Sequence, residues 1–181
     1  MFTKADGLPS DVPMTVLTTH DGMLWAGFNC GGLVRFDGQS FRTYNDKDGL
    51  LNTCVYTLAE DLNRDLWIGT YGGGIFRFRD GSFTQFSKPQ GLPRNIVTLM
   101  IAARDGSLWF STQVAVSRLR DGRIRDYNIA DGLPSNELYG IHEDLNGRIW
   151  VGTTKGLHVL EGDRFVKVPS VPDVHASIVG E

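Results

Sequence analysis

Short runs of apolar and β-branched residues, separated by glycine-rich polar turns, recur along the whole chain. The clearest run, Leu66-Trp67-Ile68, follows the polar stretch Asp61-Leu62-Asn63-Arg64 and precedes a glycine. The same phrase of turn, tryptophan and small residue occurs four times and contains all four tryptophans of the chain: Trp25, Trp67, Trp109 and Trp150. Such a regular spacing, close to 42 residues, predicts one structural unit used four times.

The pattern of apolar runs and turns within each unit predicts four antiparallel strands in about 42 residues, with no helix. In the second unit, the turn Asp48-Gly49-Leu50-Leu51 leads into a first strand over 53–60, and the tryptophan strand follows. A variable loop, a third strand over 75–78 and a last strand containing Phe83 and Phe86 complete the unit. The four pairs before the tryptophan strands are Asp21-Gly22, Asn63-Arg64, Asp105-Gly106 and Asn146-Gly147. Three of them are the Asp-Gly or Asn-Gly pairs that favour two-residue hairpins, in which both central residues have positive φ.

The repeats define a single all-β region over residues 1–181. Their predicted bounds are 6–47, 48–89, 90–130 and 131–171, and 172–181 starts a fifth repeat. Phe2 aligns with Tyr44, in the last strand of a unit, so both ends of the sequence fall inside repeats. We expect an excised part of a larger array. A closed four-bladed ring and two chains that self-associate into an eight-bladed ring are the alternatives.

The tryptophan strands are nearly continuous apolar runs, which indicates sheets buried on both faces. Four-stranded sheets stacked around an axis form a β-propeller, whose blades are sandwiched between neighbours. We therefore predict an all-β propeller of four-stranded antiparallel blades, partial or small, in which Trp25, Trp67, Trp109 and Trp150 fill the blade interfaces. They are structural core residues rather than a binding cage.

Composition and charge exclude several classes of function. The net charge of −3, without basic clusters, argues against nucleic-acid binding. No apolar run approaches the ~20 residues that span a bilayer, and the N-terminus lacks a signal-peptide pattern. Asp61-x-Asn63-x-Asp65 resembles the start of a calcium loop, but no closing glutamate follows. The four histidines have no metal-site spacing, so we expect no metal, cofactor or catalytic residue.

Two other residue sets have structural interpretations. Cys30 and Cys54 fall near the same end of adjacent repeats, where a disulfide is conceivable, but without evidence of export we expect two free thiols. Arginine recurs in the third strand at Arg35, Arg77 and Arg118 and is absent from the fourth repeat. We expect these arginines to form ion pairs within their blades.

The candidate binding residues lie in loops. Because strand directions alternate, the Gly-Leu turns and the loops after the tryptophan strands should share one end of the propeller, at the mouth of its channel. The polar and aromatic side chains there differ between repeats, as expected for function on a rigid scaffold. They are Asn29, Tyr71, Arg94, Asn95, Gln113, Asn136, Glu137 and Lys155. Such a mouth suits a small polar ligand, for example a sugar.

The phrase DGLPSN…L..I.ED.NGR.WVGT..GL over residues 131–157 resembles the two-component regulator propeller repeat. This resemblance covers nearly the whole chain. It implies the periplasmic or extracytoplasmic sensor propeller of a bacterial hybrid histidine kinase or diguanylate cyclase, which binds a ligand such as an oligosaccharide. The kinase or cyclase output would lie outside this chain. Ser111 and Gln90 depart from the glycine and aspartate of the other repeats.

Two other functions remain open. A propeller lyase similar to the streptogramin lyases needs a histidine base with acidic metal ligands at the channel mouth. His142 and Glu143 are adjacent on one strand and should point to opposite faces, which weakens this hypothesis. A protein-interaction scaffold would instead present apolar or charged patches across the loops.

Overall fold

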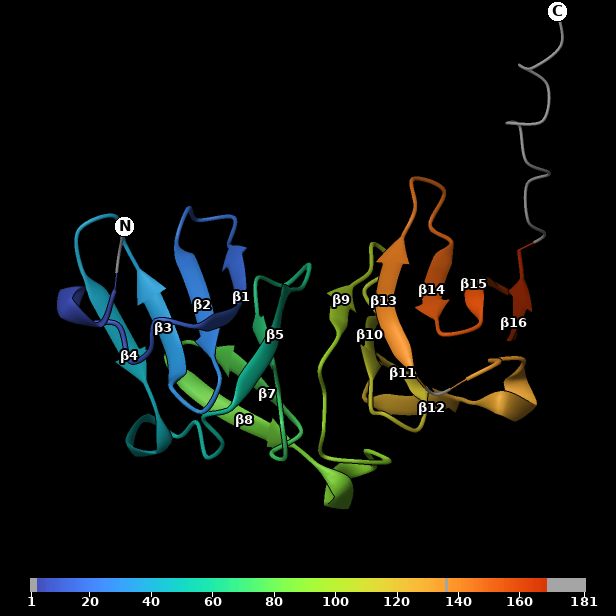
Figure 1. Cartoon of the computed structure of the whole chain (residues 1–181), viewed down its shortest axis with the longest axis horizontal. Helices are drawn as coiled ribbons and strands as arrows, with labels where there is room; N and C mark the ends of the chain where they lie inside the picture. Colours follow the sequence, from blue (N-terminus) through green and yellow to red (C-terminus); the bar gives the residue numbers. More distant parts are fainter. Residues whose placement is uncertain (1–2, 136, 169–181) are drawn as a thin grey trace, which may run out of the picture.

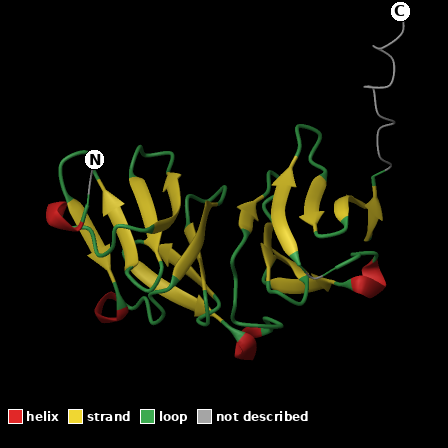
Figure 2. Cartoon of the chain, in the orientation of Figure 1, coloured by secondary structure: helices red, strands yellow, loops and turns green. Residues whose placement is uncertain are grey.

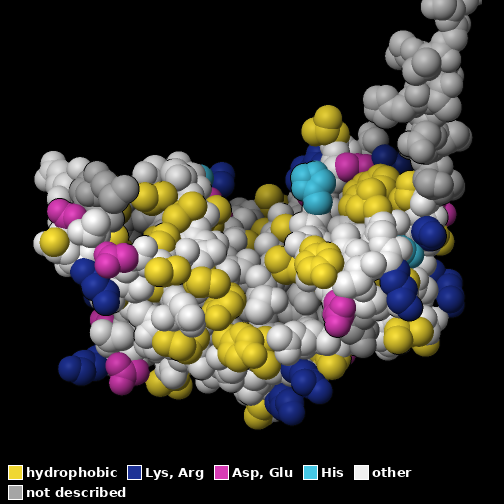
Figure 3. Space-filling model, viewed as in Figure 1, with side chains coloured by type: hydrophobic (Ala, Val, Ile, Leu, Met, Phe, Trp, Pro, Cys, Tyr) yellow, Lys and Arg dark blue, Asp and Glu magenta, His cyan; other side chains and the backbone are white. Residues whose placement is uncertain are grey.

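The computed structural model describes residues 3–135 and 137–168, and these form four consecutive four-stranded antiparallel sheets (Figures 1 and 2). In each sheet the strands pair in chain order. We call the sheets blades 1 to 4. They follow one another along the long axis of the molecule, from blue to red in Figure 1, and Figure 3 shows apolar and charged side chains interspersed on the same face of the molecule. The fold is the predicted all-β propeller arrangement with four blades.

The strand bounds are as follows. Blade 1 contains β1 (Pro13–Thr18), β2 (Leu24–Phe28), β3 (Gly32–Phe36) and β4 (Phe41–Tyr44). Blade 2 contains β5 (Val55–Glu60), β6 (Leu66–Thr70), β7 (Ile75–Arg79) and β8 (Ser82–Phe86). Blade 3 contains β9 (Met100–Ala102), β10 (Leu108–Ser111), β11 (Val116–Arg120) and β12 (Arg123–Tyr127). Blade 4 contains β13 (Leu138–Glu143), β14 (Ile149–Thr153), β15 (Gly156–Glu161) and β16 (Arg164–Lys167).

The expectation of units without helix was wrong, because a one-turn 3₁₀ helix precedes each Gly-Leu turn. These helices are η1 (Lys4–Asp6), η2 (Asp46–Asp48), η3 (Lys88–Gln90) and η4 (Ile129–Asp131). Each has a capping box, and each ends at a glycine in the left-handed conformation, such as Gly49 with φ 98°. A helix of three residues is too short to show a helical periodicity of apolar residues, so the sequence pattern did not indicate it. No helix among the described residues is long and apolar enough to cross a bilayer.

The tryptophan hairpins also differ from the two-residue turns that we predicted. In blade 1 the Gly22 amide donates to the Thr19 carbonyl (2.9 Å) and the Thr19 amide donates to the Met23 carbonyl (2.9 Å). This is a turn of the type I class followed by a left-handed residue. Only the last residue has positive φ: Gly22, Arg64, Gly106 or Gly147. The pair Asp-Gly fits both hairpin types, so the sequence alone did not separate them.

Three apolar cores join the four blades, and each contains the tryptophan of the preceding blade. Trp25 packs with Leu58 and Leu66 of blade 2, while Trp67 and Trp109 occupy the same place in the next two interfaces. These three indoles are 2–7% exposed. Trp150 is only partly buried, because no described blade lies beyond it.

The glycine two residues after the tryptophan allows the next blade to pack closely against the tryptophan strand. A Cβ placed on Gly27 would lie 2.3 Å from Val55 Cγ1, and one on Gly69 would lie 2.4 Å from Thr57 Cγ2 and 2.9 Å from Val97 Cγ1. The glycine of the tryptophan phrase therefore receives a valine of the following blade: Val55 in β5 for Gly27, and Val97 in the segment before β9 for Gly69. In blade 4 the equivalent Gly152 meets nothing nearer than 4.0 Å.

An arginine covers the outer side of three tryptophans. The guanidinium carbons of Arg77 and Arg118 lie 5.9 and 5.4 Å from the rings of Trp67 and Trp109. Both also pair with an aspartate of their own blade: Arg118 with Asp105 at 2.6 Å, and Arg77 with Asp65 at 3.9 Å. In blade 4, which lacks the third-strand arginine, Arg148 takes over this role at 5.1 Å from Trp150.

Arg35 departs from this arrangement. In the part of the chain that the structure describes, its guanidinium has no ion pair, so the prediction of an ion pair in blade 1 was wrong. The carboxylate that pairs with Arg77 is Asp65, and Met23 occupies the corresponding position in blade 1.

Candidate functional site

The loops after the tryptophan strands meet the segments that enter the next blade, as the alternation of strand directions predicted. The amides of Gly72 and Gly74 donate to the Asn95 carbonyl (2.9 and 2.8 Å), which joins the loop of blade 2 to the entry of blade 3. The Gly32 amide donates to the Thr53 carbonyl (2.9 Å) in the same way. We call this end of the molecule the loop face. It consists of residues 29–31, 52–54, 71–74, 93–98, 113–115, 134–135, 137 and 154–155.

A disulfide crosses the loop face from blade 1 to blade 2. Cys30 and Cys54 are bonded at an S–S distance of 2.01 Å, so the expectation of two free thiols was wrong. The hydrogen bond between Gly32 and Thr53 holds the two loops together, and Cys30 adopts a left-handed backbone (φ 56°). The sequence placed both cysteines near one face, but only the fold shows that they meet.

Two tyrosines lie beside the disulfide. The rings of Tyr56 and Tyr71 are 5.5 Å apart, and Tyr71 is 47% exposed. The Tyr56 hydroxyl donates to Asn29 Oδ1 (3.4 Å), so the predicted residues Asn29 and Tyr71 lie on either side of Tyr56. This group presents aromatic faces and one amide to solvent.

A hollow of about 510 Å³ lies between blades 3 and 4 on the same face. Two predicted residues, Gln113 and Glu137, line it. Its other lining residues are Thr98, Ser111, Leu138 and Tyr139. Gln113 has a left-handed backbone (φ 63°) and an exposed side chain, and Tyr139 is 74% exposed. Hydroxyl, amide and carboxylate groups therefore converge beside one aromatic ring.

The other predicted residues have different surroundings. Asn95 is partly buried, and its Oδ1 accepts from the Lys88 amide (2.8 Å), so its side chain fixes the loop that contains it. Arg94 and Lys155 are exposed on the rim. Asn136 lies outside the described residues.

The prediction missed Tyr56, Tyr139, Thr98 and Ser111. Tyr56, Thr98 and Tyr139 occupy one repeat position, at or just before the start of the first strand, and Met14 is the equivalent in blade 1. An aromatic residue at that position in two repeats was a usable signal. Both tyrosines belong to strands, so the variation among loop residues does not reveal them.

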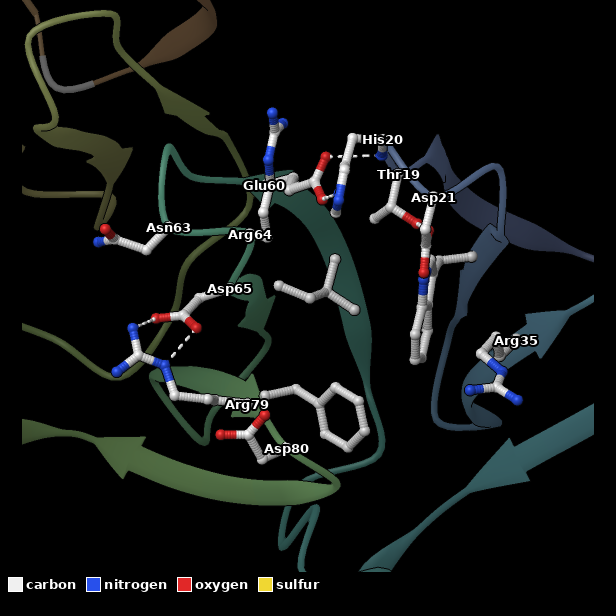
Figure 4. Close-up of a pocket in the computed structure, with 13 residues that line it drawn as sticks. Thr19, His20, Asp21, Arg35, Glu60, Asn63, Arg64, Asp65, Arg79 and Asp80 are labelled. Carbon is white, nitrogen blue, oxygen red and sulfur yellow. Dashed lines mark hydrogen bonds and ion pairs between the residues drawn. The ribbon is translucent and has the colours of Figure 1, made fainter.

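A second cleft, of about 440 Å³, opens between the hairpin turns of blades 1 and 2 (Figure 4). Some of its charged groups pair with each other. His20 Nδ1 lies 2.7 Å from Glu60 Oε1, and the Arg79 guanidinium binds both oxygens of Asp65. The Thr19 hydroxyl donates to Asp21 and lowers the pKa of that carboxyl. The pair of His20 with Glu60 links blades 1 and 2, whereas the pair of Arg79 with Asp65 lies within blade 2.

The calcium-like motif is explained by the turn. Asp61 Oδ1 accepts from the amides of Asn63 (2.8 Å) and Asp65 (3.0 Å), and its Oδ2 accepts from the Trp67 indole (2.8 Å). Among the described residues, no group of three or more histidine, cysteine, aspartate or glutamate side chains could hold a metal ion.

A family model described as the two component regulator propeller matches residues 132–155, within the fourth repeat. No curated protein sequence is significantly similar to the chain. Among solved structures, the extracellular domain of a proposed hybrid two-component system from B. thetaiotaomicron is similar over 87% of this chain, with 26% identity and a TM-score of 0.76. A second such domain from the same organism shares 20% identity over 91% of this chain, with a TM-score of 0.74.

A lyase propeller also matches the fold. Catalytically inactive virginiamycin B lyase from Staphylococcus aureus, solved with quinupristin, covers 88% of this chain at 20% identity, with a TM-score of 0.71. The chain spans 56% of the lyase but only 23% and 25% of the two extracellular domains. At this identity, the likeness to the lyase shows the fold alone.

Proposed function

We propose that this chain is a ligand-sensing module of a bacterial signal-transduction receptor, because its fourth repeat matches the two component regulator propeller model and its fold matches extracellular domains of two-component systems. The module is itself non-catalytic and binds a polar ligand of the oligosaccharide class at the loop face. Kinase or cyclase output belongs to other parts of the receptor.

The hollow between blades 3 and 4 carries this proposal. Its volume of about 510 Å³ lies within the range of small-molecule sites. Gln113 and Glu137 offer an amide and a carboxylate for sugar hydroxyls, and the exposed Tyr139 ring offers an apolar face for a sugar ring. Tyr71 and Tyr56 add a second aromatic surface on the same face.

Two further observations support an extracytoplasmic location. The matched domains from B. thetaiotaomicron are extracellular. The disulfide between Cys30 and Cys54 is of the kind that persists in oxidising compartments.

A lyase activity is the second candidate, because a lyase shares the fold. Such an enzyme needs a histidine base beside the substrate. His20 pairs with Glu60 at the hairpin end, and His158 is buried. His142 is exposed on β13, while Glu143 pairs with Arg104, so these neighbours do not form a catalytic pair.

Binding to an immobilised oligosaccharide array, followed by calorimetry on the hits, tests the sensor proposal. Gln113→Ala and Tyr139→Ala should each weaken binding about tenfold, which is the effect of losing roughly 1.4 kcal/mol of binding free energy. Asn63→Ala, at the hairpin end, is the matched control and should leave the affinity unchanged. Absence of any hit, or a hit that only Asn63→Ala weakens, would contradict the proposal.

A further inference from the structure

Ser111 interrupts the repeat beside the hollow between blades 3 and 4. The position two residues after the tryptophan is glycine in the other three blades and serine in blade 3. Ser111 is the last residue of β10, and β13 of blade 4 lies beside β9 and β10 (Figure 1). The serine hydroxyl therefore lies where two blades meet, and it lines the hollow on the loop face.

The serine accompanies a change in how the next blade packs. The glycines of blades 1 and 2 leave room for Val55 and Val97, which occupy equivalent positions in blades 2 and 3. Both valines are fully buried. The equivalent residue of blade 4, Leu138, is only partly buried and lines the hollow. Since a serine side chain is larger than a hydrogen atom, Ser111 takes part of the space that a valine fills at the two earlier interfaces.

The Ser111 hydroxyl is buried without a hydrogen-bond partner. The residue is 3% exposed, and its Oγ forms no hydrogen bond with any part of the chain that the structure describes. The other buried serines of blade 3 are paired. Ser107 Oγ donates to Asp105, and Ser117 Oγ donates to Asp126. A buried hydroxyl without a partner lowers stability. Glycine serves at this position in the other blades, so the fold does not require the hydroxyl, and its place beside a hollow indicates ligand binding.

The remaining polar groups of the hollow can also bind a ligand. The side chains of Thr98, Gln113 and Glu137 form no hydrogen bond or ion pair with other described residues. The hollow thus offers two hydroxyls, an amide and a carboxylate, and its described lining contains no lysine, arginine or histidine. A carboxylate accepts hydrogen bonds from sugar hydroxyls and repels a second carboxylate. This set of groups fits an uncharged saccharide.

We propose that Ser111 and Glu137 make the hollow specific for uncharged saccharides, an inference that rests on the proposed sensor function. The Ser111 hydroxyl forms a hydrogen bond with a sugar hydroxyl that enters between blades 3 and 4. Glu137 accepts hydrogen bonds from other sugar hydroxyls and rejects sugars that carry a carboxylate. The exposed ring of Tyr139 packs against the apolar face of the sugar.

An array of paired carbohydrates tests the preference for an uncharged ligand. Each uncharged oligosaccharide is paired with a uronic-acid counterpart of equal length, for example the tetrasaccharides of galactose and of galacturonic acid. The native chain should bind the uncharged member about tenfold more tightly, because like charges in one site repel. Glu137→Gln, which removes the charge and keeps the shape, should reduce this preference. A native chain that prefers the acidic member would overturn the inference.

Calorimetry with the tightest-binding uncharged tetrasaccharide of the array tests Ser111. Ser111→Ala and Ser111→Gly should each weaken binding about fivefold, the loss expected for one neutral hydrogen bond. Both variants should fold, since glycine occupies this position in the other blades. Ser117→Ala is the matched control, because it removes an equally buried hydroxyl of blade 3 that pairs with Asp126. It should lower stability and leave the affinity unchanged.

Singly deoxygenated analogues of the same tetrasaccharide separate a direct contact from a structural effect. For one analogue, loss of the sugar hydroxyl and loss of the Ser111 hydroxyl should cost no more together than either costs alone. Unchanged affinity of Ser111→Ala, or additive losses for every analogue, would overturn this inference and leave the sensor proposal standing. A native chain that binds no saccharide of the array would overturn both.

Discussion

A single aspartate holds both the turn and the tryptophan in the even-numbered blades. In blade 4, Asp144 Oδ1 accepts from the amides of Asn146 and Arg148, and its Oδ2 accepts from the Trp150 indole (2.9 Å). Asp61 does the same in blade 2. The odd-numbered blades have Thr19 and Ala103 there, so their indoles have no such acceptor.

These contacts make the stability of the fold depend on the ionisation of Asp144. Burial raises the pKa of the Asp144 carboxyl, but hydrogen bonds from the Trp150 indole and from Arg148 outweigh it and hold this pKa well below its usual value. Because the pKa is lower in the folded chain than in the unfolded chain, Asp144 stabilises the fold above about pH 4, and this stability is lost as the pH falls further.

Asp144→Asn should therefore reduce the dependence of stability on pH. The amide oxygen can still accept from the Asn146 and Arg148 amides, but the NH2 group in place of Oδ2 cannot accept from the Trp150 indole, and the amide has no charge to lose. Urea unfolding at about pH 5 and about pH 2.5 should show a smaller loss of unfolding free energy for Asp144→Asn than for the native chain. Asp46→Asn, which removes an exposed carboxylate, is the control. Parallel pH profiles for Asp144→Asn and the native chain would refute the assignment.

At the scale of the element, the glycine of the tryptophan strand fixes the distance between blades. Gly69 lies in β6, and an added Cβ would come within 2.4 Å of the Thr57 side chain and 3.1 Å of the Val97 carbonyl oxygen. Neither backbone can retreat easily, since β5 and β6 are paired and Val97 lies in the second core. The strand that carries the tryptophan therefore cannot accept a side chain here.

Gly69→Ala should destabilise the chain by about 1–3 kcal/mol, the usual cost of overpacking a core. Gly152→Ala is a control within the same fold, because it has the same place in blade 4 but open space around it. It should change the unfolding free energy by less than about 0.5 kcal/mol. Chemical denaturation at low protein concentration measures both. Equal effects of the two substitutions would be inconsistent with the packing argument.

Strand order and blade number could be predicted because each repeat carries its own pattern of apolar residues and turns. The hairpin type could not, since Asp-Gly suits both types and Arg64 adopts a left-handed backbone without being glycine. The 3₁₀ helices were missed because three residues have no helical periodicity. Local patterns thus determined the elements but not the fine geometry of their ends.

Fewer features of the candidate site than of the fold could be predicted from the sequence. Gln113 and Glu137 come together because blades 3 and 4 place them around one hollow, which no local pattern encodes. Tyr56 and Tyr139 belong to strands, so a search restricted to loops excluded them. The contacts of Glu60 and Glu143 to the preceding blade recur two repeats apart, which is invisible within one repeat.

At the scale of the whole molecule, blades 1 and 2 are joined by contacts of several kinds. They share the first apolar core, the pair of His20 with Glu60 lies at the hairpin end, and the disulfide lies at the loop face. The disulfide closes a segment with a sequence separation of 24 residues, which includes β3 and β4. It therefore restricts the unfolded chain over half of blade 1.

Loss of the disulfide should lower the unfolding free energy by about 2–4 kcal/mol, as for other loops of this length. Urea unfolding of the native chain with and without dithiothreitol measures the effect. A Cys30→Ser, Cys54→Ser double variant should match the reduced chain and not respond to the reductant. Thiol titration in denaturant provides the decisive check, because the oxidised native chain should contain no free thiol and the reduced chain should contain two. Two free thiols after purification under oxidising conditions would show that the loops do not meet, and would remove the disulfide as support for an extracytoplasmic location.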